Sequence, residues 1–151
     1  MSTEHQTIMA RALAEAEAAA ARGEVPVGAV VAGPDGAVLA AAGNRVEELN
    51  DPSAHAEILA IRAAAVTLGS PRLIDCDLHV TLEPCPMCAQ AISFARIRRL
   101  VFGAYDPKGG GVEHGPRIYS QPTCHHAPEV IGGVEESRAG DLLRKFFQDR
   151  R

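Results

Sequence analysis

The stretch DLHVTLEPCPMC, Asp77–Cys88, decides the fold class of this chain. Its first half is an apolar run with valine and threonine, which is typical of a strand. Two prolines then bracket Cys85, and proline is tolerated in the first turn of a helix, where its missing N–H has no partner to lose. We therefore expect a strand over Asp77–Leu82 that leads directly into a helix over about Pro86–Ala95.

Helices and strands alternate along the rest of the chain. The segment Tyr105–Pro128 has no clear period and is expected to be a loop. Helix propensity, apolar runs, turn residues and helical spacing predict the other elements: a helix over Thr7–Arg22, a hairpin of strands Val27–Ala32 and Ala37–Ala41, a helix over Ala54–Leu68 capped by Asp51 or Ser53, a strand over Arg99–Gly103, and an amphipathic helix over Glu135–Gln148. This alternation favours a three-layer α/β sandwich.

The composition is that of an ordinary folded domain, with 151 residues, of which 46% are hydrophobic and 23% charged. This length suits one hydrophobic core, so we expect a single domain over residues 1–151. The N-terminal segment shows neither a signal-peptide pattern nor a run long enough to cross a bilayer, and we expect a cytoplasmic protein. The cysteines, 4 in number, are too few for the dense stapling of small secreted folds, which favours free thiols.

The net charge of -4 gives no overall attraction to phosphate backbones. This disfavours a nonspecific nucleic-acid binder, and any RNA contact needs a local basic patch. The residues that could form one are Arg96, Arg98, Arg99, Arg144, Lys145, Arg150 and Arg151. Solvated helix faces and ends are the alternative interpretation of the same charges.

Cys85 and Cys88 lie three residues apart, so on a helix both sulfurs face the same side and can reach one tetrahedral ion. A position at the start of the helix also favours thiolate, the form that binds metal, because the positive end of the helix dipole lies there. His55 can supply a third ligand from the start of the preceding helix. Three protein ligands leave a fourth position open, which is typical of a catalytic zinc site.

Glu57 follows His55 by two residues and is the candidate for proton transfer. Zinc in such a site lowers the pKa of bound water towards roughly 7, which makes hydroxide available at neutral pH. The carboxylate of Glu57 could take the proton from this water and deliver it to a substrate. Residues two apart on a regular helix point about 200° apart, so we expect His55 at the helix boundary, where the backbone is not fully helical.

The pattern His55-Ala56-Glu57 followed by Pro84-Cys85-x-x-Cys88 resembles the H-x-E and P-C-x-x-C motifs of the zinc nucleobase deaminases. The resemblance extends to EVPVGAVV, GNR at residues 43–45, DPSAHAEILAIR, RLIDCDLHVTLEPCPMCAQAI, RIRRLVFGAYDPKGG and LLRKFFQDRR. Over nearly the whole chain these segments are similar to the bacterial tRNA-specific adenosine deaminases of the cytidine and deoxycytidylate deaminase superfamily. FGAYDPKGG and the basic, aromatic C-terminal segment discriminate best, because other deaminases share the metal motif.

This resemblance implies a three-layer α/β/α cytidine-deaminase-like fold with a five-stranded mixed sheet. It also implies hydrolytic deamination of the wobble adenosine of a tRNA anticodon loop to inosine, with hydroxide on one Zn²⁺ per subunit as nucleophile and Glu57 as proton shuttle. Asn44 and Ala56 would bind the flipped purine, while Asp106 and Lys108 would border the anticodon. The expected partners are a tRNA anticodon stem-loop and a second copy of the chain in a homodimer, with no membrane.

Several alternatives stay open at this point. A free-base or nucleotide deaminase, such as one for guanine, would use the same metal motif, as would a pyrimidine deaminase. A structural zinc module would complete its coordination with Cys76, His79 or Cys124. A dithiol redox protein would use Cys85 and Cys88 and would leave His55 and Glu57 without a role.

The segment 109–133 departs from the shorter version in the family, which leaves the details of RNA contact open. It contains Cys124, His125 and His126, which invite a second-metal interpretation. Adjacent residues rarely converge on one ion, so we expect instead a loop that packs or hydrogen-bonds at the rim of the site. Cys76 and His79 flank the strand over Asp77–Leu82, and we expect burial or simple exposure for them rather than a role as ligands.

Overall fold

Five strands form one mixed sheet in the computed structural model, which describes residues 3–150. In chain order they are β1 (Gly28–Ala32), β2 (Val38–Gly43), β3 (Asp77–Leu82), β4 (Arg99–Ala104) and β5 (Glu129–Ile131). The order across the sheet is β2-β1-β3-β4-β5. Strand β1 runs antiparallel to β2 and β3, whereas β4 runs parallel to β3 and β5. The sheet is therefore mixed, as the family resemblance implied.

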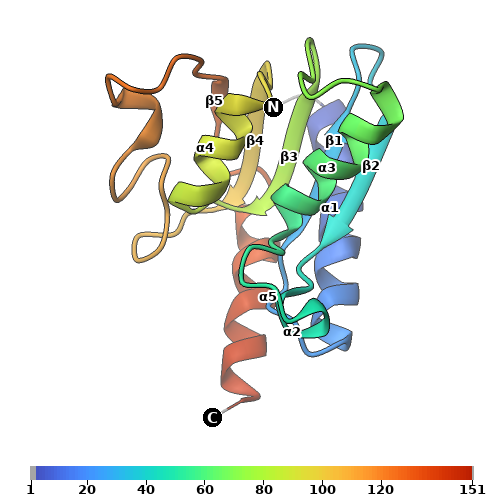
Figure 1. The fold of residues 1–151 in the computed structure, drawn as a ribbon. Coiled ribbons are helices and arrows are strands. Elements are labelled where there is room, and N and C mark those ends of the chain that lie inside the picture. Colours follow the sequence, from blue (N-terminus) through green and yellow to red (C-terminus); the bar gives the residue numbers. More distant parts are fainter. Residues whose placement is uncertain (1–2, 151) are drawn as a thin grey trace.

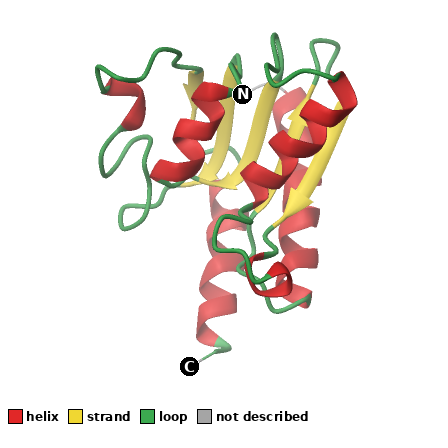
Figure 2. Ribbon diagram, viewed as in Figure 1, coloured by secondary structure: helices red, strands yellow, loops and turns green. Residues whose placement is uncertain are grey.

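Helices cover both faces of this sheet (Figures 1 and 2). They are α1 (Thr3–Ala21), α2 (Val46–Leu49), α3 (Ala56–Leu68), α4 (Pro86–Phe94) and α5 (Glu136–Gln148), with a short 3₁₀ helix, η1 (Ile118–Ser120). Helices α1 and α5 pack on one face, and α3 and α4 pack on the other. The expected three-layer α/β/α fold class is confirmed.

Two apolar cores lie on the two faces of the sheet. Strand β1 is buried along its whole length, with Val31 in the core on the α3–α4 side and Val30 in the core on the α1–α5 side. Gly28 lets α1 approach closely, because a Cβ at this position would lie 1.9 Å from the carbonyl oxygen of Ala12. The alanines of α1 serve the same close packing, since the inward-facing ones are fully buried: Ala12, Ala16 and Ala19.

The expected bounds agree with the structure to within a few residues for most elements. Strand β3 has the predicted bounds, while α1 begins about one turn earlier than expected. Two short elements, α2 and β5, were not expected at their positions. Strand β5 has only 3 residues and pairs with β4 alone, so its stability comes from a distant partner rather than from a local apolar pattern.

The expected cap of α3 is wrong. Asp51 accepts hydrogen bonds from the backbone N–H and the hydroxyl of Ser53, which closes a local turn before the helix. The N-cap residue is His55, with φ −74° and ψ 152°, and its side chain makes no capping hydrogen bond. The imidazole is therefore left available for another purpose.

The amino ends of α3 and α4 lie next to the carboxyl end of β3, at the lower edge of the sheet in Figure 1. Strand β3 passes directly into α4, which puts the start of α4 at this edge of the sheet. The loop residues of this edge therefore lie next to the amino ends of two helices. Among residues 3–150, none of the helices has both the length and the apolar character needed to cross a membrane.

Candidate metal centre and active site

Three side chains converge at this edge of the sheet. His55 is the N-cap residue of α3, Cys85 is the N-cap residue of α4, and Cys88 lies within the first turn of α4. The Nδ1 atom of His55 lies 3.6 Å from Sγ of Cys85 and 3.5 Å from Sγ of Cys88. Within residues 3–150, these form the one group of three or more His, Cys, Asp or Glu side chains close enough together to hold a metal ion.

The spacing of these atoms fits a tetrahedral zinc ion. Zinc–sulfur bonds of about 2.3 Å and zinc–nitrogen bonds of about 2.1 Å at a tetrahedral angle require a separation of about 3.6 Å between the ligand atoms. The two measured nitrogen–sulfur distances match this value. The group therefore fits one Zn²⁺ per chain.

The electrostatics of the two cysteines also suit a cation. A hydrogen bond from the thiol of Cys88 lowers the pKa of Cys85 to about 4, against the effect of burial and with a further contribution from His55. The pKa of Cys88 is raised, because this thiol keeps the proton that it shares with Cys85 and because it is buried. The pair thus holds thiolate character at neutral pH, which is the form that binds zinc.

Glu57 lies beside this cluster, on the second residue of α3. Its side chain is buried, and burial raises the pKa of its carboxyl to about 7. A carboxyl with a pKa near neutrality can both accept and donate a proton under working conditions. The extended backbone of His55 explains why both residues line the same cavity, as the sequence predicted.

A cavity of about 580 Å³ opens in front of the cluster. This volume lies within the range of about 300–1,000 Å³ that is typical of small-molecule sites. Its lining includes His55, Glu57 and Cys85, together with Phe146 of α5 and Arg150, which follows that helix. The site can therefore take a group of nucleobase size next to the metal ligands.

Comparisons with known proteins agree with this geometry. The family model for the cytidine and deoxycytidylate deaminase zinc-binding region matches residues 2–104. A tRNA-specific adenosine deaminase from Agrobacterium fabrum is 59% identical over 98% of this chain and 97% of that protein. This chain belongs to the tRNA-specific adenosine deaminases, within the cytidine and deoxycytidylate deaminase family.

Solved structures extend the comparison to the fold of this deaminase. A structure from a study of A-to-I editing by tRNA:A34 deaminases superposes with a TM-score of 0.89 and 60% identity, over 91% of this chain and 99% of that one. A guanine deaminase from Nitrosomonas europaea superposes with a TM-score of 0.76 and 27% identity, over 93% and 83% of the two chains. Among the relatives, the same fold thus occurs in deaminases of different purines.

The expected substrate residues of the deaminase fall into two groups. Asn44 and Asp106 line the cavity, whereas Ala56 is fully buried and Lys108 is exposed, and neither of these two lines it. The Oδ1 atom of Asn44 accepts a hydrogen bond from the backbone N–H of Ala56. Asp106 uses Oδ1 to accept hydrogen bonds from the backbone N–H groups of Lys108 and Gly109, which closes a tight turn.

Sequence reasoning missed two buried carboxylates in the cavity wall of the deaminase. Glu24 accepts hydrogen bonds from the backbone N–H groups of Glu47 and Glu48, at the start of α2. Glu83 accepts several from the loop that follows β4. The position of Glu83, directly before the metal-binding Pro84-Cys85 turn, was the available signal.

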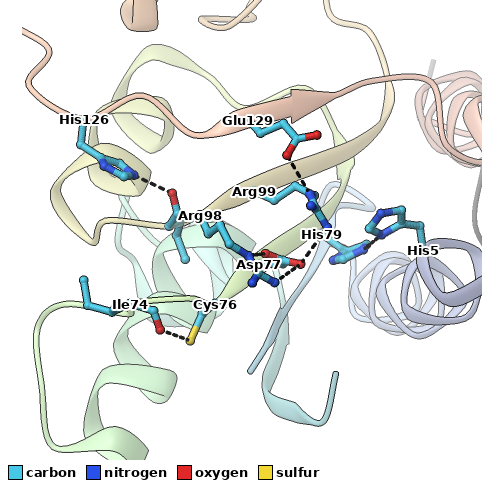
Figure 3. A network of polar contacts seen from close by, with 10 residues as sticks. His5, Ile74, Cys76, Asp77, His79, Arg98, Arg99, His126 and Glu129 are labelled. Carbon is cyan, nitrogen blue, oxygen red and sulfur yellow. Dashed lines mark hydrogen bonds and ion pairs between the residues drawn. The ribbon is translucent and has the colours of Figure 1, made fainter. Parts of the chain in front are cut away.

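The structure separates some of the residues that could have formed one basic patch. Arg98 and Arg99 form ion pairs with Asp77 at the starting ends of β3 and β4, as Figure 3 shows. Arg150 instead lines the cavity beyond the opposite end of β3. The two sets of cations therefore lie at opposite ends of the sheet, and Arg151 falls outside the described residues.

Within the described part of the chain, the Cys124 segment contributes to no group of metal ligands. The Cys124 thiol and the Ser93 hydroxyl both hydrogen-bond to the backbone carbonyl of His126, and the His126 ring bonds to the carbonyl of Ile97. The segment is thus hydrogen-bonded, as expected, but beside the last turn of α4 rather than at the rim of the site.

The side chains that could have completed a structural zinc site do not join the cluster in the described part of the chain. Cys76 and His79 are buried next to and within β3, as Figure 3 shows, and Cys124 lies at the far end of α4. Three candidate ligands are left, which is the number typical of a catalytic zinc site.

Proposed function

We propose that this chain hydrolyses the wobble adenosine of a tRNA anticodon loop to inosine and releases ammonia. The observation that carries the proposal is the buried carboxyl of Glu57 beside the convergent atoms of His55, Cys85 and Cys88. The name of the Agrobacterium fabrum relative supports the choice of tRNA adenosine as substrate.

In this proposal His55, Cys85 and Cys88 are the zinc ligands and Glu57 is the catalytic residue. Zinc, when bound, supplies Lewis-acid chemistry that lowers the pKa of a water molecule. Glu57 takes a proton from the attacking water and passes protons to the purine ring and to the departing amine. Water and adenosine are thereby converted to inosine and ammonia, and Glu57 returns to its starting state.

Asn44 orients the purine in this account. Because its Oδ1 is held by the N–H of Ala56, its side-chain NH₂ group is the part left to donate to the base. Ala56 then acts through Asn44, while Asp106 and Lys108 contact the nucleotides around the target. The base must leave the stack to reach Glu57, which costs a few kcal/mol and costs less in a loop that is already single-stranded.

We infer a homodimer from an apolar surface on α3 and α4, defined here as Val66, Leu68, Met87 and Phe94. These side chains are exposed, with Val66 at 84% and Phe94 at 69% of their full exposure. Exposed apolar side chains on one face of a domain are a feature of interaction surfaces, and a second copy would bury these four. We also propose a single domain over residues 1–151 and a cytoplasmic location, where its tRNA substrate is found.

A guanine deaminase is the second candidate, because the guanine deaminase from Nitrosomonas europaea shares the fold. The two functions are separated by incubating the zinc-loaded protein with an anticodon stem-loop that carries a wobble adenosine and, in parallel, with free guanine, adenine and cytidine. Inosine in the stem-loop supports the proposal. Turnover of guanine alone would overturn it in favour of the second candidate.

A further inference from the structure

Glu83 carries a buried carboxylate to which no Arg or Lys in the described residues is paired by a salt bridge. Its side chain has an exposed fraction of 0%, and its Oε1 accepts hydrogen bonds from the backbone N–H of Asp106 at 3.0 Å and from Nδ1 of His114 at 2.8 Å. Its Oε2 accepts three more, from the backbone N–H groups of Val112, Glu113 and His114. One carboxylate thus accepts five hydrogen bonds from N–H groups of a single loop.

These hydrogen bonds account for an ionised carboxylate in the interior. The five N–H donors replace the hydrogen bonds to water that the carboxylate of Glu83 loses on burial, so it needs no cationic partner. Several charge-assisted hydrogen bonds to one carboxylate also form a strong anchor. The loop from Asp106 to His114 is therefore held mainly through its backbone, with one further hydrogen bond from the side chain of His114.

The anchored loop also contacts the turn that carries Cys85. Glu83 lies two residues before Cys85, and the backbone N–H of Gly111 donates to the carbonyl of Pro84 at 2.8 Å. Gly110 is required for this approach, because a Cβ at its position would lie 2.3 Å from Oε2 of Glu83. The glycine run therefore lets the loop close over the buried carboxylate.

The anchored loop is the one that faces the proposed substrate. It begins at Asp106, which lines the cavity, and it includes Lys108, which is exposed beside it. Glu83 also lines the cavity, but its side chain has no exposed surface and both of its oxygens are bonded to the loop. Its effect on a nucleic acid must pass through the loop.

We propose that Glu83 is the positioning residue of the RNA-facing loop, which it holds against the metal-binding turn so that Asp106 and Lys108 are in place before the stem-loop arrives. This inference rests on the proposed function for its substrate. Pre-ordering a binding loop removes an entropic cost from binding, so loss of the anchor weakens RNA binding more than it slows the chemical step.

The test uses the zinc-loaded full chain with Glu83→Gln. Glutamine keeps the volume but turns an NH₂ group towards N–H donors, so it cannot accept all five hydrogen bonds. We expect the amides of Val112, Glu113 and His114 to exchange with solvent deuterium at least about 10-fold faster, with zinc content unchanged. For the stem-loop, we expect KM to rise about 10-fold while kcat stays within about 3-fold.

Three further variants complete the test. Glu24→Gln removes another buried carboxylate that binds backbone N–H groups, and it should leave exchange at Val112–His114 unchanged. If Glu83→Gln fails to fold, His114→Ala is the variant to measure instead. It removes one of the five N–H donors, the half-exposed side chain of His114, and we expect about 3-fold faster exchange at these amides. His125→Ala, at an exposed histidine of the neighbouring segment, is its matched control and should have no effect.

Unchanged exchange at Val112–His114 in both Glu83→Gln and His114→Ala would overturn the proposal. Loss of zinc or of kcat in Glu83→Gln, with the loop amides still protected, would also overturn it, because Glu83 would then act on the metal ligands. The exchange measurement needs no substrate. If the wild-type protein leaves the stem-loop unreacted, the proposed function is contradicted. The exchange measurement still tests whether Glu83 anchors the loop.

Discussion

The side-chain oxygen of Asn44 accepts a hydrogen bond of 2.7 Å from the backbone N–H of Ala56. This bond satisfies an N–H group at the start of α3, which the N-cap residue His55 does not serve with its own side chain. The oxygen of Asn44 is thereby held at the start of the helix and its NH₂ group is left to donate to a substrate, while the imidazole of His55 makes no capping bond. Asn44 thus takes part both in capping the helix and, in the proposed function, in recognising the substrate.

Asn44→Asp should separate these two roles. An aspartate keeps an oxygen for the N–H of Ala56 but has no NH₂ group to offer a purine. We expect the melting temperature to stay near that of the wild type while kcat/KM for the stem-loop falls about 10- to 100-fold. Asn44→Ala should lose both roles and destabilise the protein by about 1 kcal/mol. Wild-type kinetics in Asn44→Asp would show that the amide does not orient the base.

Glu57→Gln should abolish turnover without disturbing the metal ligands. Glutamine has nearly the same shape but cannot carry a proton between water and substrate, so we expect kcat to fall by about 10²- to 10⁴-fold. Zinc content and thermal stability, measured on the same preparation, should be unchanged. A silent substitution would instead indicate a structural zinc site.

The stability of the protein should fall in mild acid because of His79. Its Nδ1 is buried without a hydrogen-bond partner among the described residues, and Nε2 lies 3.0 Å from Nδ1 of His5, as Figure 3 shows. Burial, with the nearby His5, lowers the pKa of His79 from 6.5 to about 4. In that interval the unfolded chain binds a proton that the folded chain does not, so the free energy of unfolding decreases as the pH falls.

The expected loss is about 3 kcal/mol between pH values near 6.5 and near 4. Urea unfolding of the wild type and of His79→Leu at both ends of this interval measures it. The difference between the two proteins removes contributions common to both, including acid release of zinc. Identical acid sensitivity in the two proteins would argue against a neutral buried His79.

Phe94→Asp should separate the proposed dimer into single chains. Phe94 belongs to the apolar α3–α4 surface, and a charge there would be buried without a partner in the dimer. Phe147→Asp is the matched control, because Phe147 is 52% exposed but lies on α5, on the opposite face of the sheet. Light scattering should report a single chain for the first variant and two chains for the second. Two chains in both would contradict this interface.

The local parts of the fold and site could be predicted from the sequence. The passage from β3 into α4 is encoded by adjacent residues, and so is the spacing of Cys85 and Cys88. The position of His55 at a helix boundary followed from the requirement that it and Glu57 reach one site, and the structure confirms it.

The long-range parts could not be predicted from local patterns. Strand β5 depends on pairing with β4, and the anchor at Glu83 depends on amides that follow it by more than twenty residues. Arginines that could have formed one patch lie at opposite ends of the sheet, because the charge pattern of a sequence does not specify which ends of the strands and helices meet. Arg98 shows this most clearly, since it pairs with Asp77 far from the cavity.

The zinc content of freshly purified protein, prepared without chelator, tests the central claim most directly. The separations between His55, Cys85 and Cys88 predict about one zinc per chain in the wild type, and a large loss of zinc in Cys85→Ser, which replaces a ligand sulfur with a hydroxyl. A wild-type preparation that is folded and deaminates the stem-loop without stoichiometric zinc would contradict the account.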